Sequence, residues 1–84
     1  MKSLNGLVEL ILSGASDANI RFWDLRTLLG KLGFEERIRG SHHIYTKAGI
    51  SEIINIQPAG NKAKPYQIKQ VREIIVRYKF PGIL

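Results

Sequence analysis

Residues 34–57, FEERIRGSHHIYTKAGISEIINIQ, decide the fold of this 84-residue chain. Apolar and polar residues alternate in three runs of this stretch, which are residues 34–39, 41–47 and 53–57. Such alternation is typical of strands with one buried face. Gly40 follows the first run, a turn is expected at residues 48–51, and Pro58 ends the third run. Three consecutive strands with short connections predict an antiparallel sheet.

The first run also predicts part of the core. Phe34 and Ile38 fall on one face of the expected strand, and the opposite face carries Glu35, Arg37 and Arg39. Phe22 and Phe34 flank a helix expected at residues 24–32, and large aromatic residues at the ends of a helix usually pack against the core. We therefore expect both phenylalanines to be buried.

Three further segments have apolar residues at helical spacing. They are Leu4, Leu7, Val8 and Ile11, then Leu25, Leu28, Leu29 and Leu32, and finally Ile68, Val71, Ile75 and Tyr78. We expect helices at residues 24–32 and 66–78 on one face of the sheet, and a short N-terminal helix that ends at Gly14. Residues 59–65 are expected to form a polar loop. The predicted fold class is α+β, in a single small domain with an additional N-terminal helix.

The charge of the chain indicates a polyanionic partner. It has 13 Lys and Arg against 7 Asp and Glu, a formal charge of +6, and such a charge attracts nucleic acid. The absence of cysteine excludes disulfides, thiolate nucleophiles and cysteine zinc sites. The longest apolar run near the N-terminus, residues 7–12, is too short for a secretion signal or a membrane span. We therefore expect a cytoplasmic protein without a membrane partner.

One segment offers groups for catalysis. Residues 37–47, RIRGSHHIYTK, place two histidines among basic residues. The ordinary pKa of histidine, about 6.5, permits proton transfer near neutral pH. A neutral imidazole can therefore remove the 2′-hydroxyl proton of RNA, after which the oxygen attacks the adjacent phosphate. Because His42 and His43 are neighbours that diverge on a strand, we expect no metal site.

The residue types alone leave a structural role for the histidine pair open. A histidine at the start of a strand is often solvated or satisfied within the core, and on this ground the structural role is favoured about two to one. Alternation adds a conflict, since His42 shares a face with Ile44 and His43 with Tyr45. If Ile44 faces the core, His43 is the exposed histidine. An irregular strand start after Gly40 would release His42 from this rule.

The motif Gly40-Ser41-His42, followed by Ile44 and Tyr45 and preceded by Leu32-Gly33-Phe34, resembles the HicA family of toxin mRNA interferases. The resemblance extends from about residue 22 to residue 78. It implies an α-β-β-β-α fold similar to double-stranded RNA-binding domains. It also implies that the protein cleaves mRNA in the cytoplasm without a metal or cofactor, and that a HicB-like antitoxin neutralises it. The residue implied as general acid or base is His42, and His43 is held in reserve.

The resemblance divides the chain into an N-terminal helical extension, residues 1–19, and a HicA-like domain, residues 20–84. The expected contacts to RNA are Arg37, Arg39, Ser41, Lys47, Lys62 and Lys64. The third-strand segment 55–58 and the loop 60–64 look like a subgroup variant, which leaves the catalytic activity open. The main alternative is an RNA-binding module without catalysis, since the same fold class binds RNA through its shape and backbone. A small interaction domain with incidental charge ranks last, because it leaves the Gly-Ser-His segment without a role.

Overall fold

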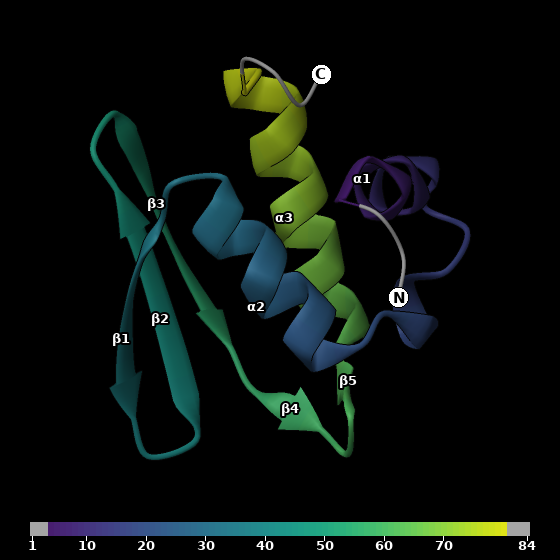
Figure 1. Cartoon of the computed structure of the whole chain (residues 1–84), viewed down its shortest axis with the longest axis horizontal. Coiled ribbons are helices and arrows are strands. Elements are labelled where there is room, and N and C mark those ends of the chain that lie inside the picture. The colour runs from purple at the N-terminus through teal and green to yellow at the C-terminus, as the bar shows by residue number, and fades with distance from the viewer. Residues whose placement is uncertain (1–3, 81–84) are drawn as a thin grey trace.

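The computed structural model describes residues 4–80 (Figure 1). Residues 1–3 and 81–84, which belong to the predicted extension and domain, lie outside the described residues. The elements in chain order are α1 (Leu4–Ser13), the short 3₁₀ helix η1 (Asp17–Asn19), α2 (Phe22–Lys31), β1 (Glu35–Arg39), β2 (His42–Lys47), β3 (Ile50–Ile56), β4 (Pro58–Ala59), β5 (Lys62–Ala63) and α3 (Pro65–Tyr78). Strands β1, β2 and β3 form an antiparallel sheet in that order. This confirms the predicted α-β-β-β-α arrangement with an additional helix before it.

One hydrophobic core lies between the sheet and the helices. Helices α2 and α3 lie on the same side of the sheet (Figure 1). Helices α1, α2 and α3 and the sheet all contribute buried side chains to this core. They include Leu7, Val8, Ile11, Leu25, Leu28, Leu29, Ile68, Val71 and Ile75 from the helices, and Tyr45, Ile54 and Ile56 from the strands. Phe22 and Phe34 are buried, as predicted. Within residues 4–80, no helix is long and apolar enough to cross a membrane.

Strand β1 departs from the predicted burial pattern at its far end. Phe34 is buried, but Ile38 is 54% exposed, so its expected place in a buried face is wrong. The position between them on this face belongs to Glu36, whose carboxylate binds Arg26 of α2. Ile38 is uncovered because the turn between β1 and β2 projects past the end of α2 (Figure 1).

The segment predicted as a polar loop, residues 59–65, is partly regular. Strands β4 and β5 form a two-stranded hairpin, with Gly60 at φ +65° in the turn, a conformation that glycine adopts without strain. The hairpin then pairs with the chain before α2, because Ala63 N–H donates to the Ile20 carbonyl over 2.9 Å. Periodicity could not reveal these two short strands, since each has only two residues.

Helix α2 begins at Phe22, two residues before the predicted start at Asp24. No side chain caps this end. Instead the Phe22 N–H donates to the carbonyl of Asn61 in the β4–β5 turn over 3.0 Å. A partner 39 residues away therefore satisfies one of the backbone donors that a helix start leaves unpaired.

Candidate functional site

The face of the sheet that points away from the helices carries basic and polar side chains. In the register of the sheet, Arg39 pairs with His42, Arg37 pairs with Ile44, and Ile44 pairs with Asn55. Directly paired residues project from the same face of an antiparallel sheet. The structure thus brings two of the predicted RNA contacts, Arg37 and Arg39, to the same exposed face as His42.

Two amide side chains hold the ring of His42. The amide nitrogen Nε2 of Gln57 lies 3.0 Å from Nε2 of the imidazole, and Nδ1 lies 3.2 Å from Oδ1 of Asn55. An amide nitrogen can only donate, so the ring nitrogen Nε2 accepts and carries the lone pair. The neutral ring then has its proton on Nδ1, which donates to Asn55. This arrangement places the basic nitrogen of His42 toward Gln57 on the exposed face.

The amide of Gln57 connects His42 to two further predicted site residues. Its oxygen Oε1 accepts a hydrogen bond from Lys64 Nζ over 3.4 Å, and its nitrogen Nε2 donates to Ser41 Oγ over 3.1 Å. Lysine can only donate, which fixes the orientation of this amide. The side chain of Gln57 therefore links both Ser41 and Lys64 to the imidazole of His42.

The two histidines lie on opposite faces of the sheet. Tyr45 is 1% exposed and faces the helices, so the premise that Ile44 faces the core is wrong. His43 shares the buried face with Tyr45. Its ring meets the Phe22 ring edge to face with centroids 4.9 Å apart, and its side chain is 13% exposed. His42, in contrast, is exposed, and the predicted conflict with strand alternation disappears without a bulge at Gly40.

His43 belongs to a cluster around the carboxylate of Glu36. This carboxylate accepts two hydrogen bonds from Arg26, at 2.7 and 2.8 Å, one from His43 Nδ1 at 3.1 Å, and one from the Tyr45 hydroxyl. The Arg26 guanidinium, against the opposing effect of burial and together with the other donors, lowers the pKa of Glu36 to about 2. Burial, and then the hydrogen bond to Glu36, raises the pKa of Tyr45. This cluster fastens β1 and β2 to α2.

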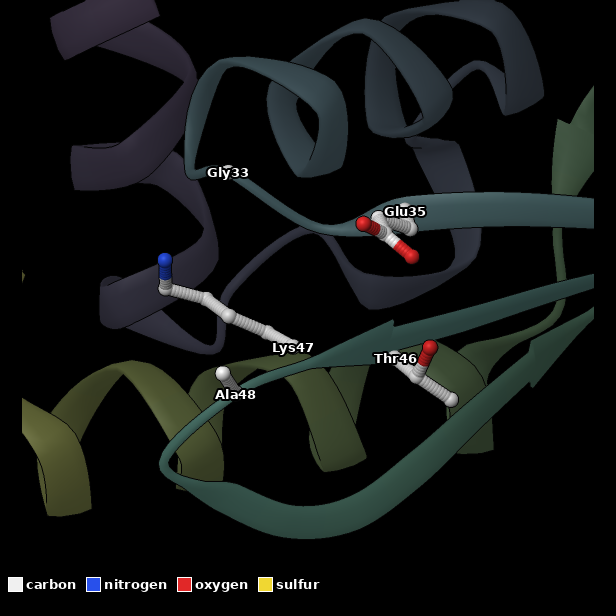
Figure 2. Close-up of a pocket in the computed structure, with 5 residues that line it drawn as sticks. All are labelled: Gly33, Glu35, Thr46, Lys47 and Ala48. Carbon is white, nitrogen blue, oxygen red and sulfur yellow. The ribbon is translucent and has the colours of Figure 1, made fainter.

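Two predicted RNA contacts, Lys47 and Lys62, have partners or neighbours other than the His42 site. Lys47 ends β2, roughly 17 Å along the strand from His42. Figure 2 shows its side chain extending toward Gly33 beside a cavity of about 440 Å³, and a Cβ atom at Gly33 would lie 2.7 Å from Nζ. Because Gly33 directly follows α2, Lys47 Nζ lies at the C-terminal end of this helix, where the helix dipole favours a cation. Lys62 has a different partner, since its Nζ donates to Asn19 Oδ1 over 3.0 Å.

A second cavity, of about 290 Å³, lies between the exposed face of β3 and the first turns of α3. The residues that line it are His42, Ile53, Asn55, Gln57, Tyr66, Gln67 and Gln70. Sequence analysis identified only His42 among them. The alternate residues 53, 55 and 57 of the third run could have indicated the strand side of this cavity, but nothing local linked them to α3. No three His, Asp or Glu side chains within residues 4–80 group as a metal site.

Comparisons with known proteins identified one family. The model of the family described as the HicA toxin of bacterial toxin–antitoxin systems matches residues 23–75, which is more than half of the chain. Neither a search of curated proteins nor a search of solved structures found a match. The matched range begins in α2, contains the whole sheet with His42 and the β4–β5 hairpin, and ends in α3.

Proposed function

Because the chain belongs to the HicA family of toxins from bacterial toxin–antitoxin systems, we propose that it is an endoribonuclease that cleaves mRNA without a metal ion. The observation that carries this proposal is the setting of His42. Its ring is exposed, its tautomer is fixed by Asn55 and Gln57, and two arginines project from the neighbouring strand on the same face. A general base needs such an oriented lone pair within reach of substrate.

The proposed reaction uses the imidazole of His42 as the base. When RNA binds, its 2′-hydroxyl replaces the Gln57 amide as the hydrogen-bond donor to Nε2. The proton then moves to Nε2, and the 2′-oxygen forms a bond to the adjacent phosphorus. The bond from phosphorus to the 5′-oxygen breaks, and that oxygen takes a proton from solvent or from the His42 imidazolium. The products are a 2′,3′-cyclic phosphate and a free 5′-hydroxyl.

The cations near His42 are proposed to bind the RNA backbone. Arg39 is the direct strand partner of His42, and Arg37 lies one row further along the same face. Lys64 reaches the site through Gln57. These charges would neutralise phosphates and the additional charge that develops during attack. Lys47 and Lys62, which have other neighbours, are expected to contribute less.

The proposal extends to the partner and the compartment. We infer that a HicB-like antitoxin protein binds this toxin, because the family occurs in toxin–antitoxin pairs. An mRNA substrate implies that the protein acts in the cytoplasm. Co-purification of the chain with the product of an adjacent antitoxin gene tests this partner directly.

Replacement of His42 by Ala tests the proposed chemistry. Wild-type protein in EDTA should cleave single-stranded RNA and leave 2′,3′-cyclic phosphate ends, while DNA of the same sequence stays intact. The variant should lose roughly 10²- to 10⁴-fold in rate. Thr46→Ala is the matched control, because Thr46 is exposed on the same strand and the same face, two rows along β2 from His42. Full cleavage by the His42 variant, or a different end group, would exclude this mechanism.

One observation favours RNA binding without cleavage as the second candidate. The Gln57 amide occupies Nε2 of His42, so the base is free only when this hydrogen bond breaks. If RNA binds beside the histidine without displacing Gln57, no proton transfer follows. In that case wild-type protein and the His42→Ala variant would bind RNA with similar affinity, and neither would cleave it.

A further inference from the structure

We propose that the cavity between β3 and the start of α3 binds a single nucleobase of the RNA and selects a base that presents a carbonyl oxygen, such as uracil. This inference rests on the proposed function, since it assigns the selection of RNA sequence to a place beside His42. Its basis is a buried hydrogen-bond donor without a partner, two exposed apolar side chains, and the size of the cavity.

The donor is the side-chain amide of Gln67, which lies in the first turn of α3 and is 1% exposed. Its oxygen Oε1 accepts a hydrogen bond from the Lys64 backbone N–H over 3.0 Å, which fixes the orientation of the amide. Its nitrogen Nε2 is buried and has no hydrogen-bond partner, the sole such side-chain atom among residues 4–80. Buried polar groups are nearly always paired in folded proteins. Because Gln67 also lines the cavity, a bound acceptor would satisfy this nitrogen.

Two large side chains supply surfaces on which a flat ring can lie. Tyr66 from α3 and Ile53 from β3 both line the cavity, and they are 64% and 60% exposed. Bases stack on aromatic side chains in proteins that bind single-stranded RNA, and this contact tolerates every base. Tyr66 and Ile53 therefore explain affinity for a base, and Gln67 explains the choice among bases.

The size and the position of the cavity fit a nucleobase. Its volume of about 290 Å³ lies at the lower limit of the ligand pockets of proteins, roughly 300–1,000 Å³, and suits one small flat group. His42, Asn55 and Gln57 form its other wall. A base held here places its own ribose and phosphate next to the His42 imidazole. The selected base is thus expected beside the cleaved bond.

Binding of fluorescent 2′-fluoro oligonucleotides tests the selection without cleavage, because they have no 2′-hydroxyl. The wild-type chain should bind a uridine hexamer more tightly than an adenosine hexamer, by roughly tenfold. Gln67→Glu keeps an oxygen for the Lys64 N–H and replaces the donor by an acceptor. It should remove the preference, because a carboxylate cannot donate to the carbonyl oxygen of uracil and accepts instead from an N–H, which both bases present. An unchanged ratio of the two affinities would overturn the proposal.

Two variants separate base selection from general effects. Gln70→Glu is the matched control, because Gln70 lines the same cavity but its Nε2 already donates to the Ile53 carbonyl over 3.3 Å. It adds the same charge and should weaken both hexamers equally. Tyr66→Ala should also weaken both equally, by loss of stacking. If Gln70→Glu changes the preference as Gln67→Glu does, or Tyr66→Ala leaves both affinities intact, the cavity does not bind a base.

A cleavage assay with ordinary RNA distinguishes failure of this inference from failure of the proposed function. Cleavage without any dependence of site choice on Gln67 contradicts base selection and leaves the nuclease intact. A Gln67-dependent preference in binding by a protein that cleaves no RNA contradicts the nuclease and supports the base site. Hexamer binding that none of the three variants affects would mean that the cavity holds another group, such as a side chain of the antitoxin, and would overturn the inference.

Discussion

The imidazole rings of His42 and His43, adjacent in the chain, bind different partners on opposite faces of the sheet. The His42 ring lies between Asn55 and Gln57 on the exposed face. The His43 ring donates to Glu36 and packs on Phe22 under α2. The two positions should therefore respond to substitution in different ways, one in catalysis and the other in stability.

His43→Ala should lower the stability of the fold. The variant loses the edge-to-face contact with Phe22 and the hydrogen bond to Glu36, which together contribute about 1–2 kcal/mol. For a domain of this size, each kcal/mol shifts Tm by about 4–8 °C. Thermal unfolding followed by circular dichroism measures the change, with His42→Ala as control, for which Tm should stay close to wild type. A larger loss of Tm in the His42 variant would contradict this assignment.

The stability of the protein should fall in acid because of Glu36. Its pKa is lowered to about 2 from an ordinary value of 4.5, so the unfolded chain binds the proton more readily than the folded one. The carboxylate therefore stabilises the fold above pH 4.5, and this contribution is lost as the pH falls toward 2. Denaturant unfolding at several pH values should show a steeper loss for wild type than for Glu36→Gln. Glu9→Gln, on the exposed side of α1, should behave as wild type does.

Arg72→Ala should loosen the N-terminal helix. The Arg72 guanidinium binds both carboxylate oxygens of Asp17, at 2.8 and 3.0 Å, and the Ile11 carbonyl at 3.0 Å. Its hydrogen bonds lower the pKa of Asp17. Hydrogen exchange should accelerate in residues 4–19 of the variant, while the amides of the sheet keep their protection. Lys69→Ala, an exposed change one turn earlier on α3, is the control and should leave exchange in α1 unchanged.

Salt dependence should identify the cations that touch RNA. Arg39→Ala and Lys64→Ala should each reduce the slope of log affinity against log salt by about one unit, because each removes one phosphate contact. Lys47→Ala should leave the slope unchanged, since Lys47 lies at the other end of β2, beside Gly33. The slopes are measured from the affinity for 2′-fluoro RNA at salt concentrations from about 50 to about 300 mM. Equal slopes for all three variants would contradict the proposal that RNA binds the face of the sheet that carries His42.

Asn55→Asp should move the pH dependence of cleavage. The carboxylate would accept from Nδ1 of His42 as the amide oxygen does, but its charge favours the protonated imidazole. The acid limb of the rate profile should therefore shift to higher pH, because the base becomes available only there. Asn55→Gln moves the amide without adding charge and serves as control. An unshifted acid limb in the Asp variant would mean that His42 does not act as the base.

The helices and the sheet followed from the sequence because their signals are local. The apolar stripe through Leu25 and Leu29, and the alternation through Tyr45, each reflect contacts within a few residues along the chain. The start of α2 did not follow from the sequence, because the Phe22 N–H donates to the carbonyl of Asn61, which lies far along the chain. Ile38 was placed wrongly because alternation cannot show where a strand extends past the helix that covers it.

Only part of the site was visible in the sequence. The Gly-Ser-His motif indicated His42 directly, and the basic residues of β1 were close enough in the chain to be grouped with it. Gln57 and Gln67 carry no motif. Gln57 lies beside His42 because Ile56 pairs with His43 in the sheet, and Gln67 reaches the cavity because of the way α3 follows the β4–β5 hairpin. Amides of this kind are common on surfaces. Only the folded structure shows that one binds the imidazole and another has a buried nitrogen without a partner.

The hairpin that ties the start of α2 to the start of α3 determines where the chain can accept insertions. The Phe22 N–H donates to the Asn61 carbonyl, and the Ala63 N–H donates to the Ile20 carbonyl. Extra residues in the β4–β5 turn would therefore displace the starts of α2 and α3. Because α3 forms one wall of the cavity beside His42, that wall would move as well. The turn at residues 48–49 has no such backbone hydrogen bonds to another element among the described residues. A peptide tag inserted there should leave the fold intact, whereas the same tag after Gly60 should unfold the protein.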